Sequence, residues 1–179
     1  SSQPGLNDVL LMEIRTLLGV ETKPLLAGAR FSGDRSCRVC HAKHHVDWEL
    51  TRHACAWETL VRLGKQTDPE CVRCHVVGLN EPGGFASIQT TPHLTNVQCE
   101  SCHGGNGCAA FTGKKPDLLP AAVCQKCHDA KHSPRFDFIA ARPRTLHNRA
   151  EELAKLAPAE REAQMRKLCS GEGRQLFPP

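Results

Sequence analysis

The sequence predicts a mainly helical protein with extensive irregular structure, and three observations lead to this fold class. The 179 residues are the length of one domain, and a hydrophobic content of 40% argues against disorder. Apolar residues recur at helical spacing near both ends of the chain and in one central stretch. Aromatic residues reach only 4%, whereas there are eleven cysteines, so an ordinary side-chain core does not explain the composition.

The predicted elements follow in chain order. Residues 7–19 form an amphipathic helical pattern, and residues 45–63 form a second one. Residues 76–98 carry turn-forming Gly, Pro and Asn between short apolar runs, which indicates a small hairpin-like excursion. Residues 104–123 are rich in Gly, Lys and Pro and are expected to be irregular.

The C-terminal helices are predicted over about 149–170. The first covers 149–156, and Pro158 suits the first position of the next. Three residues of the second helix share a face and are expected to lie in the core: Met165, Leu168 and Cys169. No apolar run approaches eighteen residues, so a transmembrane segment is not expected.

Eight of the eleven cysteines form C-x-x-C pairs, and His follows each pair directly. The four motifs are Cys37-Arg-Val-Cys40-His41, Cys71-Val-Arg-Cys74-His75, Cys99-Glu-Ser-Cys102-His103 and Cys124-Gln-Lys-Cys127-His128. This pattern is the attachment signature of c-type haem, in which two thiols bind the porphyrin and the adjacent His binds the iron. The sequence therefore predicts four covalently bound haem c groups.

Neither a zinc site nor a disulfide framework accounts for the histidines that follow the cysteine pairs. A zinc ribbon also uses C-x-x-C pairs, but it does not need His directly after the second Cys. With ten His in the chain, four such placements by chance have a probability of about one in 100,000. A disulfide framework leaves the same four histidines without a role.

Four haems would also explain the low aromatic content, because each porphyrin is a large apolar plate that fills core space. The expected architecture is a single compact tetrahaem domain, 1–179, with a haem-dominated core. The N-terminal helix (about 7–19) and the C-terminal helices (about 149–170) flank a haem-binding body at about 31–147.

Six histidines remain for the second axial position of the irons: His44, His45, His53, His93, His132 and His147. Two imidazoles on each iron produce six-coordinate haem suited to electron transfer. Of these six, His44 is interpreted as the bystander, because its neighbour His45 lies close to one helical turn before Trp48.

The sequence resembles the cytochrome c-554-like multihaem family, from about Cys37 to His147. The matching segments are Trp48-Glu-Leu-Thr-Arg-His53-Ala-Cys-Ala after Cys40-His41, Asp68-Pro-Glu-Cys71, Cys74-His75-Val-Val-Gly78, Pro82-Gly-Gly-Phe85, Thr91-Pro-His-Leu94, Val97-Gln-Cys-Glu-Ser-Cys-His-Gly104 and His132-Ser-Pro-Arg-Phe-Asp-Phe138. The resemblance implies a soluble electron carrier with closely packed, mostly bis-His haems. It implies distal ligand roles for His53, His132 and His147, while His45 and His93 compete for the remaining position.

The chain departs from the family after the third motif. Members commonly read Cys-His-Gly-Pro-Gly with a distal His soon after, whereas this chain reads His103-Gly-Gly-Asn-Gly-Cys108. One iron must then bind another ligand such as His93, remain open, or be completed by a neighbouring subunit; Cys108 is a further conceivable ligand. Because five other histidines are available, we expect all four haems to be six-coordinate.

The predicted function is electron transfer through closely packed haems between redox partner proteins. One alternative is a haem enzyme with an open iron that acts on a small nitrogen or sulfur compound. Another is a subunit of a polymeric haem wire, formed by self-association into a filament. Nucleic-acid binding is not expected, because the net charge is only +4 and the basic residues are scattered without an aromatic platform.

Covalent haem attachment takes place outside the cytoplasm, so the protein is expected to be exported to the periplasm or the cell exterior. The first residues, Ser1-Ser2-Gln3-Pro4-Gly5, lack the features of a signal peptide, which suggests a mature chain. Three cysteines lie outside the haem motifs: Cys55, Cys108 and Cys169. In an exported protein two of them can pair and one stay free, or one can bridge two chains; all three can also be buried thiols.

Overall fold

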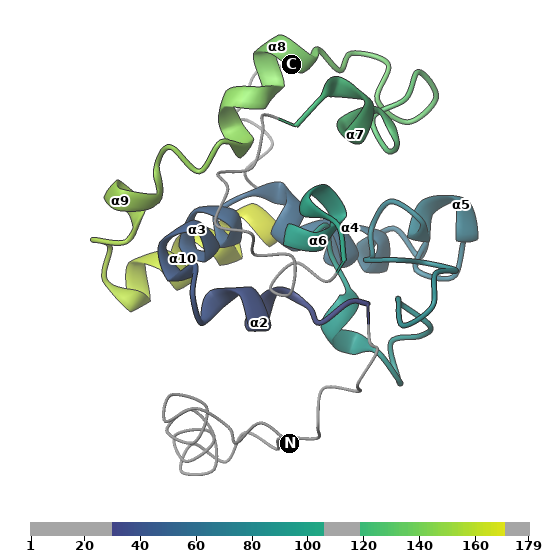
Figure 1. Ribbon diagram of the computed structural model, residues 1–179, viewed down its shortest axis with the longest axis horizontal. Helices are drawn as coiled ribbons and strands as arrows, with labels where there is room; N and C mark the ends of the chain where they lie inside the picture. Colours follow the sequence, from purple (N-terminus) through teal and green to yellow (C-terminus); the bar gives the residue numbers. More distant parts are fainter. Residues whose placement is uncertain (1–29, 106–118, 171–179) are drawn as a thin grey trace, which may run out of the picture.

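The computed structural model describes residues 30–105 and 119–170, and this part of the chain is mainly helical (Figure 1). Its elements are α2 (Asp34–Arg38), α3 (Ala42–Glu49), η1 (Arg52–Cys55), α4 (Ala56–Arg62), α5 (Pro69–Val72), η2 (Pro92–Leu94), α6 (Cys99–His103), α7 (Ala121–Gln125), α8 (Phe138–Ala141), η3 (Arg142–Thr145), α9 (Ala150–Leu153) and α10 (Pro158–Ser170). The described residues contain no strand, only one antiparallel bridge between Val76 and Thr95. The predicted fold class is therefore confirmed.

Two of the predicted elements fall wholly or partly outside the described residues. The helix expected at 7–19 lies outside them entirely. Of the stretch expected to be irregular, residues 106–118 lie outside them, and α7 begins within its last residues at Ala121. None of the described helices has the length and apolar character needed to cross a membrane.

The helical pattern at 45–63 is divided into α3, η1 and α4 instead of forming one helix. The carbonyl of Trp48 accepts hydrogen bonds from both the backbone N–H and the hydroxyl of Thr51, at 2.9 and 2.7 Å. Thr51 has an extended backbone, so the chain changes direction before η1 begins. A threonine that binds the preceding turn in this way competes with helix continuation.

The excursion at 76–98 folds back on itself as a looped hairpin, as predicted. Val77 is its centre, because its N–H donates to Leu94 and its carbonyl accepts from Phe85, at 2.8 and 2.9 Å. Gly84 packs so closely that a Cβ there would lie 1.8 Å from the Gly78 carbonyl oxygen. The loop closes over the larger apolar cluster: Phe31, Leu60, Val72, Val76, Val77, Phe85 and Leu94.

The C-terminal helices pack against α3. α9 is shorter than the predicted 149–156, because Pro158 limits the conformation of the residues before it and starts α10 as its first residue. A second apolar cluster forms here from Val46, Leu50 and Leu153, with Leu156, Met165 and Leu168 packed against it. Cys169 is bonded to Cys55, so α10 is tied to η1 by a disulfide.

Candidate haem sites

Each C-x-x-C-H motif, numbered first to fourth in chain order, is built on a short helix. The first begins on α2, the second on α5 and the fourth on α7, while α6 contains the whole third motif. In the first and fourth motifs the His N–H donates to the carbonyl of the first Cys, at 2.9 Å. A helical turn puts positions three and four apart on one side, so both thiols and the imidazole can face one ligand.

The eight motif cysteines are chemically suited to haem attachment. Disulfide bonding involves none of them in the described structure, and all are half-buried except Cys40, which is exposed. Thiols that can be reached and are not oxidised can add to a porphyrin, whereas a buried or disulfide-bonded pair cannot. The donor set therefore fits four haem c groups, each bound by two thiols and one imidazole.

Thiol hydrogen bonds and one longer-range electrostatic interaction relate the four motifs in a spatial series. Cys37 of the first motif and Cys99 of the third are hydrogen-bonded, which raises the pKa of Cys37. Burial, then a hydrogen bond to Cys74 of the second motif, raise the pKa of Cys127 in the fourth to about 12. Cys127 also interacts electrostatically with Cys102 of the third motif. The spatial order is therefore first, third, fourth, second.

A buried carboxylate joins the first motif to the third. Glu100 of α6 is 5% exposed and accepts hydrogen bonds from the backbone N–H groups of Ser32 and Gly33, both at 2.9 Å. Beside it, the Gln98 amide oxygen accepts from the N–H of Asp34 at 2.8 Å. These side chains, at and just before the third motif, satisfy the backbone donors at the start of α2, which a short helix cannot satisfy internally.

The Glu100→Gln variant is expected to lower the free energy of unfolding by about 1–3 kcal/mol. The amide replaces one acceptor oxygen with a donor, so a buried backbone N–H at Ser32 or Gly33 loses its partner. Guanidinium chloride unfolding of the oxidised holoprotein measures this change. The control is Glu162→Gln, because Glu162 is exposed and pairs with Arg166 one turn along α10. Equal stability of the two variants would contradict the proposed role of Glu100.

The second and fourth motifs are joined by exposed charges. Arg73 lies 3.4 Å from the carboxylate of Asp129 and donates to the Lys126 carbonyl at 3.5 Å. Lys131 lies 3.8 Å from Glu70. Each exposed ion pair contributes little to stability in solvent. Together, these pairs favour one orientation of the second-motif segment relative to the fourth-motif segment.

Four imidazoles gather around the first and third motifs, and we term them the first imidazole group: His41, His44, His103 and His147. The ring centroids of His44 and His41 are 5.8 Å apart, and those of His44 and His147 are 5.3 Å apart. Burial lowers the pKa of His103, and His41 and His44 lower it further. Two histidines of the C-x-x-C-H motifs therefore lie with two further imidazoles.

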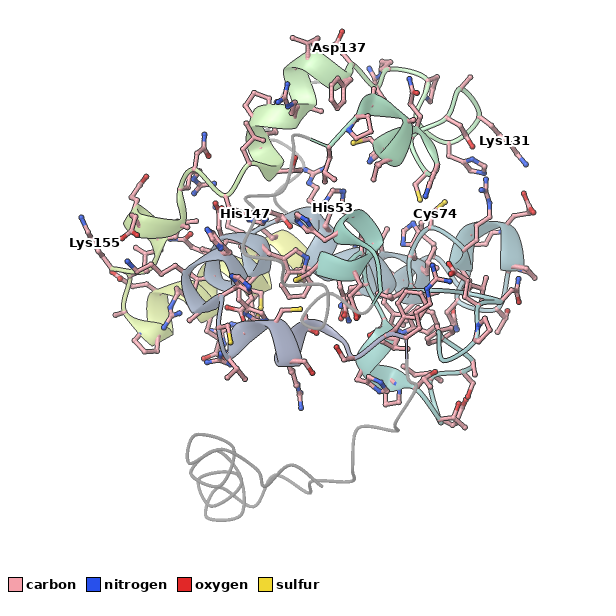
Figure 2. All side chains as sticks on the ribbon, in the orientation of Figure 1. His53, Cys74, Lys131, Asp137, His147 and Lys155 are labelled. Atoms are coloured by element: carbon pink, nitrogen blue, oxygen red, sulfur yellow. A yellow bond between two sulfur atoms is a disulfide. The ribbon has the colours of Figure 1, made fainter. Side chains whose placement is uncertain are left out.

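A second imidazole group contains His53, His75 and His128. The ring centroids of His53 and His128 are 6.1 Å apart. Burial, then the charges of His128 and His75, lower the pKa of His53 to about 4, so His53 is neutral at pH 7. The neutral imidazole is the form that binds a metal. Figure 2 labels one member of each group, His147 of the first and His53 of the second. His147 lies to the left of His53 in this view, and both lie below the segment that carries α7 and α8.

Several imidazoles are oriented by a partner at Nδ1. Nδ1 of His75 contacts the Ala56 carbonyl oxygen, and Nδ1 of His128 lies 3.1 Å from the Ser133 hydroxyl. Nδ1 of His132 lies 2.8 Å from Asp129. A bond at Nδ1 leaves Nε2 with the lone pair, which is the usual arrangement of a metal-binding His. This observation agrees with ligand roles for His75 and His132, whose partners can only accept, and for His128 when the Ser133 hydroxyl accepts.

His45 and His93, the two remaining ligands predicted from the sequence, do not lie in either imidazole group. Nε2 of His45 lies 2.8 Å from Asp34, and its Nδ1 lies 3.3 Å from Glu49. Burial opposes the charged form, but these two carboxylates outweigh it and raise the pKa of His45 to about 9. A protonated imidazole has no lone pair, so this position does not support iron binding by His45. His93 is exposed, and its ring lies beside Gly33.

His44 is interpreted from the sequence as the bystander, yet it lies with two imidazoles of the first group. The relation that favours His45, one helical turn before Trp48, is correct, since these rings are 5.2 Å apart. The same turn relates His41 to His44, and that spacing is the signal in the sequence that points to His44.

Comparison with protein families shows similarity over the first three motifs. Residues 36–104 match the family described as cytochrome c554 and c-prime. The fourth motif, at 124–128, lies outside this match. The resemblance seen in the sequence is therefore confirmed for the segment that carries the first, second and third motifs.

Two curated relatives are also similar to this chain. Cytochrome c-554 of Nitrosomonas europaea is 38% identical over 95 residues, which cover 45% of this chain and 40% of the relative. The C-type polyheme cytochrome OmcB of Geobacter sulfurreducens is 32% identical over 90 residues, covering 45% of this chain and 12% of the relative. The matched part thus spans two fifths or less of each relative. No solved structure matches this chain significantly.

Proposed function

Because residues 36–104 of this chain are cytochrome c554-like, we propose that the protein is a tetrahaem c-type cytochrome. It transfers electrons through closely packed haems between redox partner proteins. The observation that carries this proposal is the contiguous series of the four motifs, linked through Cys37 and Cys99, Cys102 and Cys127, and Cys127 and Cys74. Neighbouring attachment thiols require neighbouring haems, and short separations favour electron transfer.

The chain holds the four haem c groups through the eight motif thiols and through His41, His75, His103 and His128. The haems supply one-electron redox chemistry, and the chain supplies spacing, axial ligands and surrounding charge. Electrons would enter or leave at the ends of the series, which are the first motif (37–41) and the second (71–75). Cys40, at one of these ends, is the exposed motif cysteine.

Distal ligands follow from the imidazole groups. His53 serves the haem of His128, supported by their ring separation of 6.1 Å. His132 serves the haem of His75, supported by Asp129, which contacts both His132 and Arg73 of the second motif. His147 serves a haem of the first imidazole group. The surroundings of His45 and His93 do not support them as ligands.

The proposed location is the periplasm or the cell exterior. The Cys55–Cys169 disulfide supports it, because structural disulfides persist in oxidising compartments. The described part of the chain supports a single domain, since α9 packs on α3 and α10 is bonded to η1. Its partners are redox proteins that contact one end of the haem series.

Intact mass and carbon monoxide binding test the proposal. The denatured protein should exceed the 19.6 kDa polypeptide by the mass of four haems. We expect a second imidazole on every iron, supplied on three of them by His53, His132 and His147, so the reduced protein should bind almost no carbon monoxide. Fewer haems, or zinc in place of iron, would contradict the tetrahaem assignment. Stoichiometric carbon monoxide binding would favour an enzyme with one open iron.

A further inference from the structure

We propose that His44 is an axial ligand of the haem attached at Cys99, Cys102 and His103. The inference rests on the proposed tetrahaem function and adds a ligand that the sequence pattern alone does not favour. Its basis is the position of His44 in the first imidazole group, with ring centroids 5.8 Å from His41 and 5.3 Å from His147.

The surrounding contacts hold His44 and His147 against each other. Asp47, one turn after His44 on α3, is buried and accepts a hydrogen bond from the N–H of Arg149 at 3.2 Å. Arg149 comes two residues after His147, which itself has a left-handed backbone with φ of 52°. The segment that carries His147 is thus bonded directly to the helix that carries His44. The two imidazoles meet because the fold anchors both of their elements.

His44 and His45 cannot face the same side, because adjacent residues of an α-helix point about 100° apart. His45 is 4% exposed and lies between the carboxylates of Asp34 and Glu49. His44 is exposed, and its ring lies among imidazoles. Of the two neighbours, His44 has the surroundings of a haem ligand, and His45 has those of a structural ion pair.

The choice of haem follows from the helix. His41 is the N-cap of α3 and His44 lies one turn later, so the two rings lie on one side of the same helix. Axial ligands of one iron occupy opposite faces of the porphyrin, so His41 and His44 cannot share an iron. His103 is the other motif histidine of the first imidazole group, so the haem that it would bind is the one left for His44. His147 then remains for the haem of His41.

The test compares His44→Ala with His45→Ala in the holoprotein. His44→Ala should convert one of four haems from low to high spin and allow the reduced protein to bind one carbon monoxide. Added imidazole should restore the low-spin spectrum. His45→Ala should leave all four haems low spin. An unchanged spectrum in His44→Ala, or an open haem in His45→Ala, would overturn the assignment.

Two further measurements separate the ways in which the assignment can fail. The His44→Ala, His147→Ala double variant should bind two carbon monoxide molecules, because the two residues serve different irons; binding of one would contradict the choice of haem. Intact mass counts the haems in every variant. Four haems with no effect of His44→Ala would reject this ligand and leave the tetrahaem proposal standing, whereas fewer haems in the parent protein would reject the tetrahaem proposal. If His44→Ala does not mature, His44→Met supplies a weaker ligand, and a raised potential of one haem tests the same role.

Discussion

Removal of the Cys55–Cys169 disulfide is expected to lower the free energy of unfolding of the holoprotein by roughly 4 kcal/mol. The bond joins residues 114 positions apart, so it restricts the unfolded chain over most of its length. In the proposed tetrahaem protein, the haem thioethers would close only short loops within each motif and would not replace this bond. Alanine is the suitable replacement at both positions, because Cys55 is 3% exposed and a hydroxyl there would be buried. Guanidinium chloride unfolding of the double variant measures the loss.

Chemical reduction of the Cys55–Cys169 disulfide is a second test of the same stability loss. In the proposed tetrahaem holoprotein the eight motif thiols would be bound to porphyrin, so a mild thiol reductant should act selectively on the Cys55–Cys169 bond. Reduction of the parent protein should therefore reproduce the stability loss of the double variant. Cys108→Ser is the matched control, because Cys108 is not part of that bond. A double variant as stable as the parent would show that the disulfide contributes nothing to stability.

His53→Ala is expected to open one haem. The ring of His53 lies 6.1 Å from that of His128, and its low pKa keeps it neutral and able to bind iron. In the holoprotein, one of four haems should become high spin, and the reduced protein should bind one carbon monoxide. Optical and electron paramagnetic resonance spectra measure the first change, and carbon monoxide titration measures the second.

His93→Ala is the comparison for this variant. His93 is exposed beside Gly33, and we expect its removal to leave all four haems low spin. A high-spin haem in His93→Ala would return His93 to the set of distal ligands. An unchanged spectrum in His53→Ala would remove His53 from that set and would leave the haem of His128 without its proposed ligand.

Local patterns predicted several elements of the fold correctly. Pro158 starts α10, because proline suits the first turn of a helix, where its missing N–H has no partner to lose. The excursion at 76–98 is recognisable from its Gly and Pro residues, and the absence of a Cβ at Gly84 permits its close approach to Gly78. The helical pattern at 45–63 is also present, but periodicity does not reveal the hydroxyl of Thr51, which ends the turn at Trp48.

The pair His44 and His45 illustrates what the sequence does not determine. His44 and His45 are adjacent, and either can be placed one turn from a suitable partner, His41 or Trp48. The difference between them comes from distant residues. Asp34, which lies on another helix, occupies Nε2 of His45, and His147, about a hundred positions away, meets His44. Helical spacing specifies which residues share a side and does not specify what that side contacts.

Short sequence motifs therefore indicate the chemistry of this protein, but they do not specify how the motifs are arranged in space. The four C-x-x-C-H motifs indicate haem attachment from adjacent residues alone, because one helical turn presents both thiols and the imidazole. The order of the motifs in space, first, third, fourth, second, depends on contacts such as Cys37 with Cys99 and Glu100 with Gly33. The pairing of Cys55 with Cys169 depends likewise on α10 folding back against η1. Such contacts join residues far apart in the chain, and only the packed fold selects among the alternatives that the sequence allows.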